Sequence, residues 1–336
     1  MIYYDVFDDI EKYPDAWLIE AHSARGTGKT YGALKGCMDR GIPFLYLKRT
    51  QIDIDLISND DFSPFKPINR DTGSSVSFSK VYDGISQIKD GEQLLGYAMA
   101  LSSIHKYKGF DLSEIRIMIL DEYIPQLSER VNRKEGELLL DLYMTVSRDR
   151  EARGMPPLKL LLFANATELY CPITDTLQII DDLSELNASE SEYKYLEERG
   201  ILLHKIISQP ELTEARIFSG MQDTRWARMA FGGEFAYNDQ SKVKKVPLKG
   251  MVCHLRIRYN NQDFYIYQHK GNGLYYMCKS RGGYVDEFDM DIEADRRRFW
   301  LDYGIGLRQE ITDGNMFFSS YSAYNLIFNF TKLYKL

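Results

Sequence analysis

The sequence predicts an α/β protein in which a mostly parallel sheet flanked by helices is followed by a smaller, β-rich α+β domain. Residues 16–168 alternate short apolar strands with helical patterns, which is typical of a parallel sheet with helices on both faces. Residues 208–245 are polar and rich in glycine and charge, without a strong period, and indicate a linker. After residue 245 the apolar residues alternate as in strands, between turn signals such as GNG. A chain of 336 residues is long enough for two domains of ordinary size.

The first domain, residues 1–207, is predicted to contain four buried strands. They are short apolar runs at residues 17–21, 44–47, 115–120 and 158–164. Residues 137–153 are predicted to form a helix, because Leu139, Leu142, Tyr143 and Val146 recur at helical spacing. We expect an inserted hairpin within residues 71–103 and a further helix in the acidic stretch 181–200.

The second domain, residues 246–336, begins with three strand patterns, MVCHLRIRY, DFYIYQHK and LYYMCKS. An acidic patch at residues 286–295 follows them. A helix with Arg296, Arg297 and Arg298 and an aromatic tail then complete the chain.

The net charge of −7 excludes a uniformly basic nucleic-acid coat protein, but the charge is unevenly divided. Residues 241–336 hold 15 Lys and Arg against 10 Asp and Glu, and residues 242–281 hold nine basic residues and one acid, Asp263. Such a stretch indicates either a surface that meets a polyanion or an ordinary solvated face.

The sequence also gives expectations about the location of the protein. It shows no signal-peptide pattern, no apolar run of membrane-spanning length and no CxxC pair among its four cysteines. We therefore expect a cytoplasmic protein with buried thiols and no membrane partner, disulfide framework or zinc site.

A phosphate-binding loop is predicted at residues 23–30, SARGTGKT, between the strand WLIEA and the helical run YGALKGCM. The glycines let consecutive backbone N–H groups surround phosphate oxygens, and the following helix adds its N-terminal donors and dipole. Lys29 would place its charge on the β- and γ-phosphates, and the Thr30 hydroxyl would bind Mg²⁺. Ser23 replaces the usual leading glycine, which affects the path of the loop rather than its chemistry. The candidate nucleotide-binding residues are Ser23, Ala24, Arg25, Gly26, Thr27, Gly28, Lys29 and Thr30.

The second motif is an apolar strand, IMIL, that ends in Asp121 and Glu122. Ligands of open α/β sheets bind at the carboxyl ends of the strands. Asp121 is predicted to hold Mg²⁺, directly or through water, and Glu122 to act as the general base for the attacking water. The adjacent glutamate and the lack of an NKxD-type motif argue against a GTPase, so ATP is the expected nucleotide.

Two further residues are candidates for catalysis. Asn165 ends the strand run LLLFA and is either a sensor of the γ-phosphate and lytic water or a turn former. Its strand is predicted to lie between the phosphate-loop strand and the acidic strand, as in the additional-strand, catalytic-glutamate class of P-loop ATPases. Arg148 falls opposite the apolar stripe of its helix, whereas Arg150 falls on the buried side. Arg148 is therefore either an arginine finger for a neighbouring subunit or an ordinary surface arginine.

Together these motifs resemble the phi-29-like genome-packaging ATPases of small tailed phages. The matching segments are ARGTGK, YLKR, LDEY, MTVSRDRE, FANA and TRWARMAFGGE, and the resemblance covers most of residues 16–235. It implies ATP-driven translocation of double-stranded DNA into a procapsid by a ring of subunits, commonly a pentamer. The implied partners are the phage portal or connector and, in some systems, a packaging RNA. The implied location is the host cytoplasm, with transient action at the portal vertex.

The resemblance also implies roles for single residues. Arg148 matches a trans-acting arginine, Lys108 a basic residue at the subunit boundary or pore, and Arg49 a basic position after the second strand. The C-terminal domain resembles a ribonuclease-H-like nuclease that has lost its catalytic carboxylates. Asp263, Asp289, Asp291 and Asp295 are present, but no spacing among them indicates a two-metal site.

Basic side chains are expected to contact DNA, because phosphate contacts are strong, independent of sequence and weakened by salt. The candidates are Lys108, Lys242, Lys244, Lys245, Lys249, Arg256 and Arg258. Three alternatives stay open: a helicase-type DNA or RNA translocase, a terminase with an active nuclease domain, and a non-enzymatic portal or scaffold partner.

Overall fold

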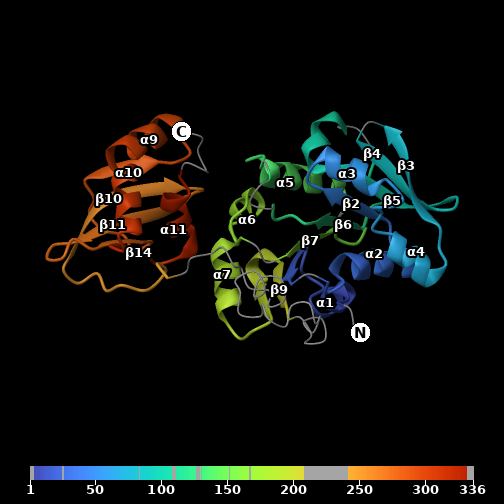
Figure 1. Cartoon of the computed structure of the whole chain (residues 1–336), viewed down its shortest axis with the longest axis horizontal. Helices are drawn as coiled ribbons and strands as arrows, with labels where there is room; N and C mark the ends of the chain where they lie inside the picture. Colours follow the sequence, from blue (N-terminus) through green and yellow to red (C-terminus); the bar gives the residue numbers. More distant parts are fainter. Residues whose placement is uncertain are drawn as a thin grey trace. The chain divides into compact units, whose positions relative to one another are not determined.

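A computed structural model describes residues 4–24, 26–82, 84–107, 111–125, 129, 131–150, 152–165, 168–207 and 241–330. It divides into two compact units, Met1–Tyr237 and Asn238–Leu336 (Figure 1). The border falls inside the stretch predicted as a linker, of which residues 208–240 lie outside the described part. Among the described residues, no helix is long and apolar enough to cross a membrane.

In the described residues, the first unit is built on a nine-stranded sheet in the order β3-β4-β5-β2-β6-β7-β1-β9-β8. Its four central strands are parallel and buried throughout apart from the ends of β7: β1 (Leu18–Ser23), β2 (Phe44–Lys48), β6 (Ile117–Asp121) and β7 (Lys159–Asn165). Strands covered on both faces read as continuous apolar runs, which is why the sequence predicted all four. β7 lies between β1 and β6, so the predicted inserted strand is confirmed.

The edges of this sheet are built from strands on either side of the central four. The predicted hairpin comprises β3 (Val76–Tyr82) and β4 (Ile85–Asp90), and β5 (Gln93–Ala100) joins it to β2 in parallel. At the other edge, β9 (Ile201–Ile206) pairs in parallel with β1, and β8 (Tyr193–Leu196) pairs antiparallel with β9.

The predicted helix over residues 181–200 is correct only for α7 (Ile180–Ala188). Residues 193–196 form β8 instead, and the short 3₁₀-helix η2 (Glu197–Arg199) follows it. Tyr193 and Tyr195 pack against the core from alternate positions, and aromatic residues favour such half-buried strands. The helix prediction rested on the acidic composition of this stretch, whereas the alternating aromatic residues favour the strand that is observed.

Helices cover both faces of the sheet, with α2 and α4 below the central strands and α5 above them in Figure 1. α1 (Val6–Lys12), α2 (Lys29–Asp39) and α4 (Lys66–Thr72) bury Phe7, Leu34 and Ile68 in one core with Ile19 and Phe163 of the sheet. The described residues also form α3 (Gln51–Ile57), the 3₁₀-helix η1 (Leu101–Tyr107), α5 (Glu135–Val146) and α6 (Pro172–Thr176).

The predicted helix over residues 137–153 ends early, at Val146. Residues 148–150 form a turn, in which Asp149 takes the left-handed conformation with φ 60°. A left-handed residue cannot continue a right-handed helix, so the turn ends it.

The second unit has a five-stranded sheet in the order β13-β10-β11-β12-β14. The three predicted strands form an antiparallel meander of β10 (Met251–Tyr259), β11 (Gln262–His269) and β12 (Tyr275–Cys278). β13 (Asp286–Asp289) lies in the acidic patch, where no strand was predicted, and β14 (Met316–Phe318) lies parallel to β12. The helical segments are α9 (Glu293–Phe299), the π-helical turn η5 (Trp300–Gly304), α10 (Ile305–Thr312) and α11 (Tyr321–Phe328). The predicted smaller, β-rich α+β domain is confirmed.

Candidate active site

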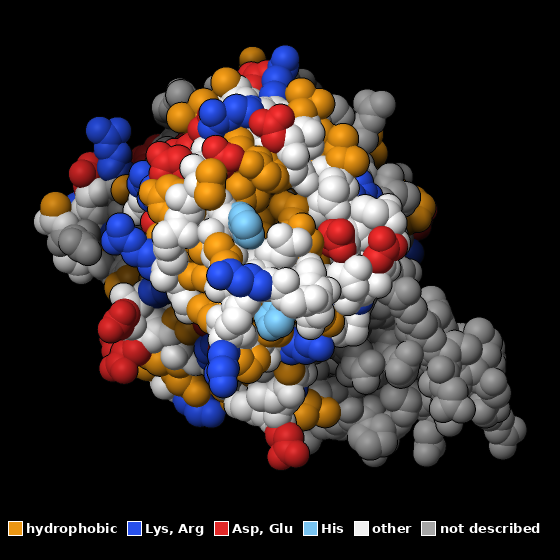
Figure 2. All heavy atoms as spheres, turned by 90° about the vertical axis from the view of Figure 1, so that its left-hand side faces the viewer, with side chains coloured by type: hydrophobic (Ala, Val, Ile, Leu, Met, Phe, Trp, Pro, Cys, Tyr) orange, Lys and Arg blue, Asp and Glu red, His pale blue; other side chains and the backbone are white. Residues whose placement is uncertain are grey.

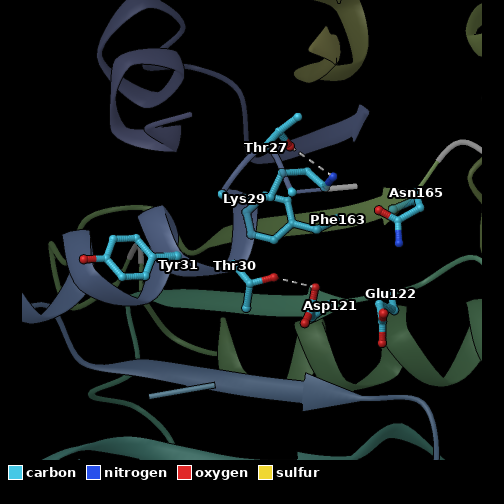
Figure 3. Close-up of a pocket in the computed structure, with 11 residues that line it drawn as sticks. Thr27, Lys29, Thr30, Tyr31, Asp121, Glu122, Phe163 and Asn165 are labelled. Carbon is cyan, nitrogen blue, oxygen red and sulfur yellow. Dashed lines mark hydrogen bonds between the residues drawn. The ribbon is translucent and has the colours of Figure 1, made fainter. Parts of the chain in front are cut away.

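A cavity of about 230 Å³ lies at the carboxyl edge of β1, β6 and β7 (Figure 3). Parallel strands bring their carboxyl ends to one edge, and the loops after them form the ligand site of open α/β sheets. The lining residues are Gly26, Thr27, Gly28, Lys29, Thr30, Tyr31, Asp121, Glu122, Phe163, Ala164 and Asn165. The fold therefore brings both predicted motifs and the predicted sensor residue together.

The phosphate loop depends on two glycines in the left-handed region, Gly26 with φ 80° and Gly28 with φ 86°. Gly28 is also the N-cap of α2, so the loop leads directly into the first turn of the helix. The carbonyl of Thr27 accepts a hydrogen bond from the Tyr4 N–H at 3.1 Å, outside the loop. A cradle for phosphate needs its carbonyls satisfied elsewhere, so that its N–H groups remain available to the anion.

Lys29 is buried and folds back onto the oxygens of its own loop. Its Nζ donates to Ser23 Oγ and lies 3.4 Å from the Ala24 carbonyl and 3.5 Å from Thr27 Oγ1. Burial lowers the pKa of Lys29 to about 8, although nearby carboxylates, Asp121 foremost, act to raise it. Ser23, which replaces the usual glycine, thus supplies an oxygen that a phosphate would replace.

The residues predicted to hold Mg²⁺ are in direct contact. Thr30 Oγ1 donates a 2.9 Å hydrogen bond to Asp121 Oδ1 (Figure 3). Asp121 Oδ2 accepts from the Tyr46 hydroxyl at 2.8 Å and from Lys48 Nζ at 3.0 Å. Burial, followed by the Asp121 charge, raises the pKa of Tyr46, which keeps its hydroxyl a donor. A hydroxyl and a carboxylate oxygen beside a phosphate loop are the hard ligands that Mg²⁺ prefers.

Glu122 and Asn165 point into the same space beside Asp121 (Figure 3). The Glu122 side chain is 62% exposed, and its Oε2 accepts a 3.0 Å hydrogen bond from Lys48 Nζ. Burial alone would lower the pKa of Lys48, but the charges of Asp121 and Glu122 outweigh burial and raise it. Lys48 therefore stays charged between the two carboxylates.

Lys48 was not predicted as a site residue, whereas its neighbour Arg49 was. Arg49 does not reach the cavity: its Nε and Nη2 each donate to Glu135 at 3.0 Å, and its Nη1 donates to Glu129. Tyr46 and Lys48 are two residues apart in β2, so their side chains lie on the same face of that strand, which pairs with β6. This spacing in a strand next to the acidic strand could have identified Lys48 as a site residue.

Arg148 is exposed, and Arg150 is only 4% exposed, as the helical wheel predicted. α5 runs back from the carboxyl edge, and the turn after it contacts the segment before β6, because Arg150 Nη2 donates to the Ser113 carbonyl at 3.0 Å. Arg148 therefore lies at the edge of the sheet opposite to the cavity of its own subunit.

Comparison with known proteins gives the family. A family profile described as Podovirus DNA encapsidation protein (Gp16) matches residues 14–290. The chain belongs to this family. The predicted phage DNA-packaging family is thereby confirmed, and the protein is a phage DNA encapsidation protein. No curated protein matches the chain.

Two solved structures share the fold of the encapsidation protein over its whole length. The bacteriophage Phi-29 viral genome packaging motor assembly has a TM-score of 0.68 at 18% identity, and the match covers 99% of both chains. The Phi-28 gp11 DNA packaging motor has a TM-score of 0.64 at 17% identity, and the match covers 99% of this chain and 98% of the other.

The predicted DNA-binding residues of the encapsidation protein have different surroundings. Lys245, Lys249 and Arg258 are exposed, and the Nζ atoms of Lys242 and Lys244 lie 5.7 and 3.6 Å from the centre of the Phe317 ring. Figure 2 shows Lys and Arg side chains distributed over one face of the second unit, with Asp and Glu side chains among them. Arg25, Lys108 and residues 224–234 lie outside the described residues.

Arg256 is already paired with two carboxylates of the second unit. Its Nη2 lies 3.0 Å from both carboxylate oxygens of Asp263, and its Nη1 donates to Glu287 at 2.9 Å. These contacts join three strands of the second unit, which favours a structural role for Arg256 over a contact with DNA.

Proposed function

We propose that the encapsidation protein packages double-stranded DNA as a ring of subunits, each of which hydrolyses ATP in the cavity at the carboxyl edge of its sheet. The convergence of Lys29, Thr30, Asp121, Glu122 and Asn165 on this one cavity carries the proposal. The two solved relatives are packaging motors, and one is described as a motor assembly, which supports a multi-subunit form.

Each residue of the cavity has a separate chemical role in this proposal. Lys29 leaves the oxygens of its loop and binds the β- and γ-phosphates. Thr30 and Asp121 hold Mg²⁺, which would neutralise phosphate charge when bound. Glu122 takes the proton of the attacking water, and Asn165 orients that water or the γ-phosphate.

Arg148 is proposed to act on the nucleotide of a neighbouring subunit. It is exposed, and it lies at the edge of the sheet opposite to its own cavity, so it cannot reach that cavity in the same subunit. A guanidinium supplied in trans would stabilise the charge that develops on the phosphates. Hydrolysis would then require the assembled ring.

The partners follow from the family and the charge distribution. We propose a pentameric ring that docks on the portal of a procapsid in the host cytoplasm and acts on double-stranded DNA. The exposed lysines and Arg258 of the second unit would contact DNA phosphates without reading sequence. We include a packaging RNA as an additional partner. The mass of the assembled motor would show whether RNA is present.

DNA packaging by variants of the cavity tests this function. Lys29→Ala and Glu122→Gln proteins should bind to procapsids but neither hydrolyse ATP nor protect DNA from nuclease. ATP turnover equal to that of the wild type in both variants would contradict the proposal. ATP-dependent unwinding of a free duplex, without procapsid, would instead favour the helicase-type translocase.

A further inference from the structure

The backbone of Glu122 is in the left-handed region, with φ 56°. A residue with a Cβ is disfavoured there, so the surrounding structure must hold it. This conformation lets the Glu122 side chain face the cavity while the next residue, Tyr123, returns to the interior and is fully buried. Whatever holds Tyr123 therefore also holds the turn at Glu122.

Tyr123 is held by two hydrogen bonds to two different strands. Its N–H donates to the Phe163 carbonyl of β7 at 3.1 Å, and its hydroxyl donates to Glu20 Oε1 of β1 at 2.9 Å. Since β7 lies between β6 and β1, these bonds tie the turn that follows β6 to β7 and to the middle of β1. Glu122 follows β6, Asn165 ends β7, and β1 leads into the phosphate loop.

Glu20 is an unusual residue for the centre of a buried parallel strand. Such strands are normally apolar, because a carboxylate removed from water is costly unless it is bonded. Glu20 is fully buried, and its second oxygen, Oε2, lies 2.9 Å from Nδ1 of His22, which is also fully buried. Burial, followed by the Glu20 charge, raises the pKa of Tyr123, so its hydroxyl remains a donor.

We propose that Glu20 and Tyr123 are positioning residues for Glu122: their buried hydrogen bond fixes the turn that points the general base into the cavity. The inference rests on the proposed role of Glu122. The hydrogen bond also connects Glu122 to β1, the strand that leads into the phosphate loop. A shift of that strand would therefore displace the general base.

The experiment compares Tyr123→Phe with Tyr143→Phe in the assembled packaging complex. The Tyr143 hydroxyl donates a 3.0 Å hydrogen bond to the Leu158 carbonyl, away from the cavity, so this control loses a tyrosine hydrogen bond of similar length to a neutral acceptor. Tyr123→Phe should lower kcat about tenfold or more and leave KM for ATP within about twofold, because a misplaced base slows chemistry rather than binding. Tyr143→Phe should lower Tm without lowering kcat. If the two variants have the same kcat, the positioning role is wrong.

Substitution of Glu20 tests the acceptor itself. Glu20→Gln keeps an oxygen that can accept from Tyr123 and should retain most of kcat, whereas Glu20→Met should lose it. Equal kcat in the two folded variants would overturn the proposal, and Tyr123→Phe decides it if Glu20→Met does not fold. Glu122→Gln is measured in parallel. Wild-type turnover in Glu122→Gln would refute the proposed base, whereas an inactive Glu122→Gln beside a fully active Tyr123→Phe would refute only the positioning.

Discussion

Lys48 Nζ lies 3.0 Å from Glu122 Oε2 and 3.0 Å from Asp121 Oδ2, so one buried cation holds both carboxylates of the acidic strand. Only Asp121 shares its burial: the Lys48 and Asp121 side chains are 9% and 11% exposed. Lys48 therefore supplies positive charge beside the carboxylate predicted to hold Mg²⁺.

We expect Lys48→Met to lower the free energy of unfolding by about 3 kcal/mol, because it leaves the buried Asp121 carboxylate without its cation. Chemical denaturation at neutral pH, without nucleotide, measures this loss. The control is Lys35→Met, whose bond to Asp39 is on the surface and whose loss should cost less than about 0.5 kcal/mol. Equal losses in the two variants would show that Lys48 does not neutralise the site.

ATP binding should take up a proton above pH 8. The pKa of Lys29 is about 8 because the side chain is buried, and bound phosphates would raise it. Well below pH 8 Lys29 is already charged and contributes little pH dependence. Above pH 8 binding must protonate it, so the Kd for ATP should rise by up to about tenfold per pH unit. Calorimetry in buffers of different ionisation enthalpy measures the proton, and Lys29→Arg, which stays charged, should abolish the uptake.

The dependence of DNA binding on salt separates the exposed cations from the paired one. A protein with Lys245→Gln and Lys249→Gln should lose about two units of slope in log Kd against log salt, because two phosphate contacts disappear. Arg256→Gln should leave the slope unchanged, because Asp263 and Glu287 already neutralise Arg256. Fluorescence anisotropy with duplex DNA measures both slopes. A drop in slope for Arg256→Gln alone would place that residue on the DNA.

The second unit should not cut DNA. Asp263 is paired with Arg256, and Asp289 Oδ1 accepts from the Asp291 N–H at 2.9 Å. Within the described parts of the chain, no group of three His, Cys, Asp or Glu could hold a metal ion. Incubation of supercoiled DNA with the full chain and Mg²⁺ or Mn²⁺ checks this. Metal-dependent cleavage that Asp289→Asn abolishes would establish a nuclease and favour the terminase alternative.

The sequence was sufficient for those parts of the fold and site that depend on neighbouring residues. The phosphate loop, the acidic strand and the central strands follow from local motifs and apolar runs, and the outward orientation of Arg148 follows from helical spacing. The wheel gave the correct side although the helix ends at Val146, because the turn keeps Arg150 buried.

Contacts between distant strands could not be predicted in this way. The bond between Tyr123 and Glu20 joins β6 to β1 across β7, so it depends on strand order as well as on the two residues. Pairing of Arg256 with Asp263 depends on the register of the β10–β11 hairpin. That register is set by the two-residue turn at Asn260 and Asn261, both in the left-handed region. Such a turn could have been predicted from the sequence, because asparagine favours this conformation.

The central claim is that each hydrolysis site combines Glu122 of one subunit with Arg148 of its neighbour, and complementation tests it most directly. Glu122→Gln and Arg148→Ala proteins are each assembled on procapsids, alone and as an equal mixture, and single-turnover ATP hydrolysis is measured. Each pure ring should be inactive, whereas the mixture should regain about a quarter of the wild-type amplitude, the share of interfaces that combine both intact residues. A mixture that stays inactive, or an Arg148→Ala ring with wild-type turnover, would contradict the shared site.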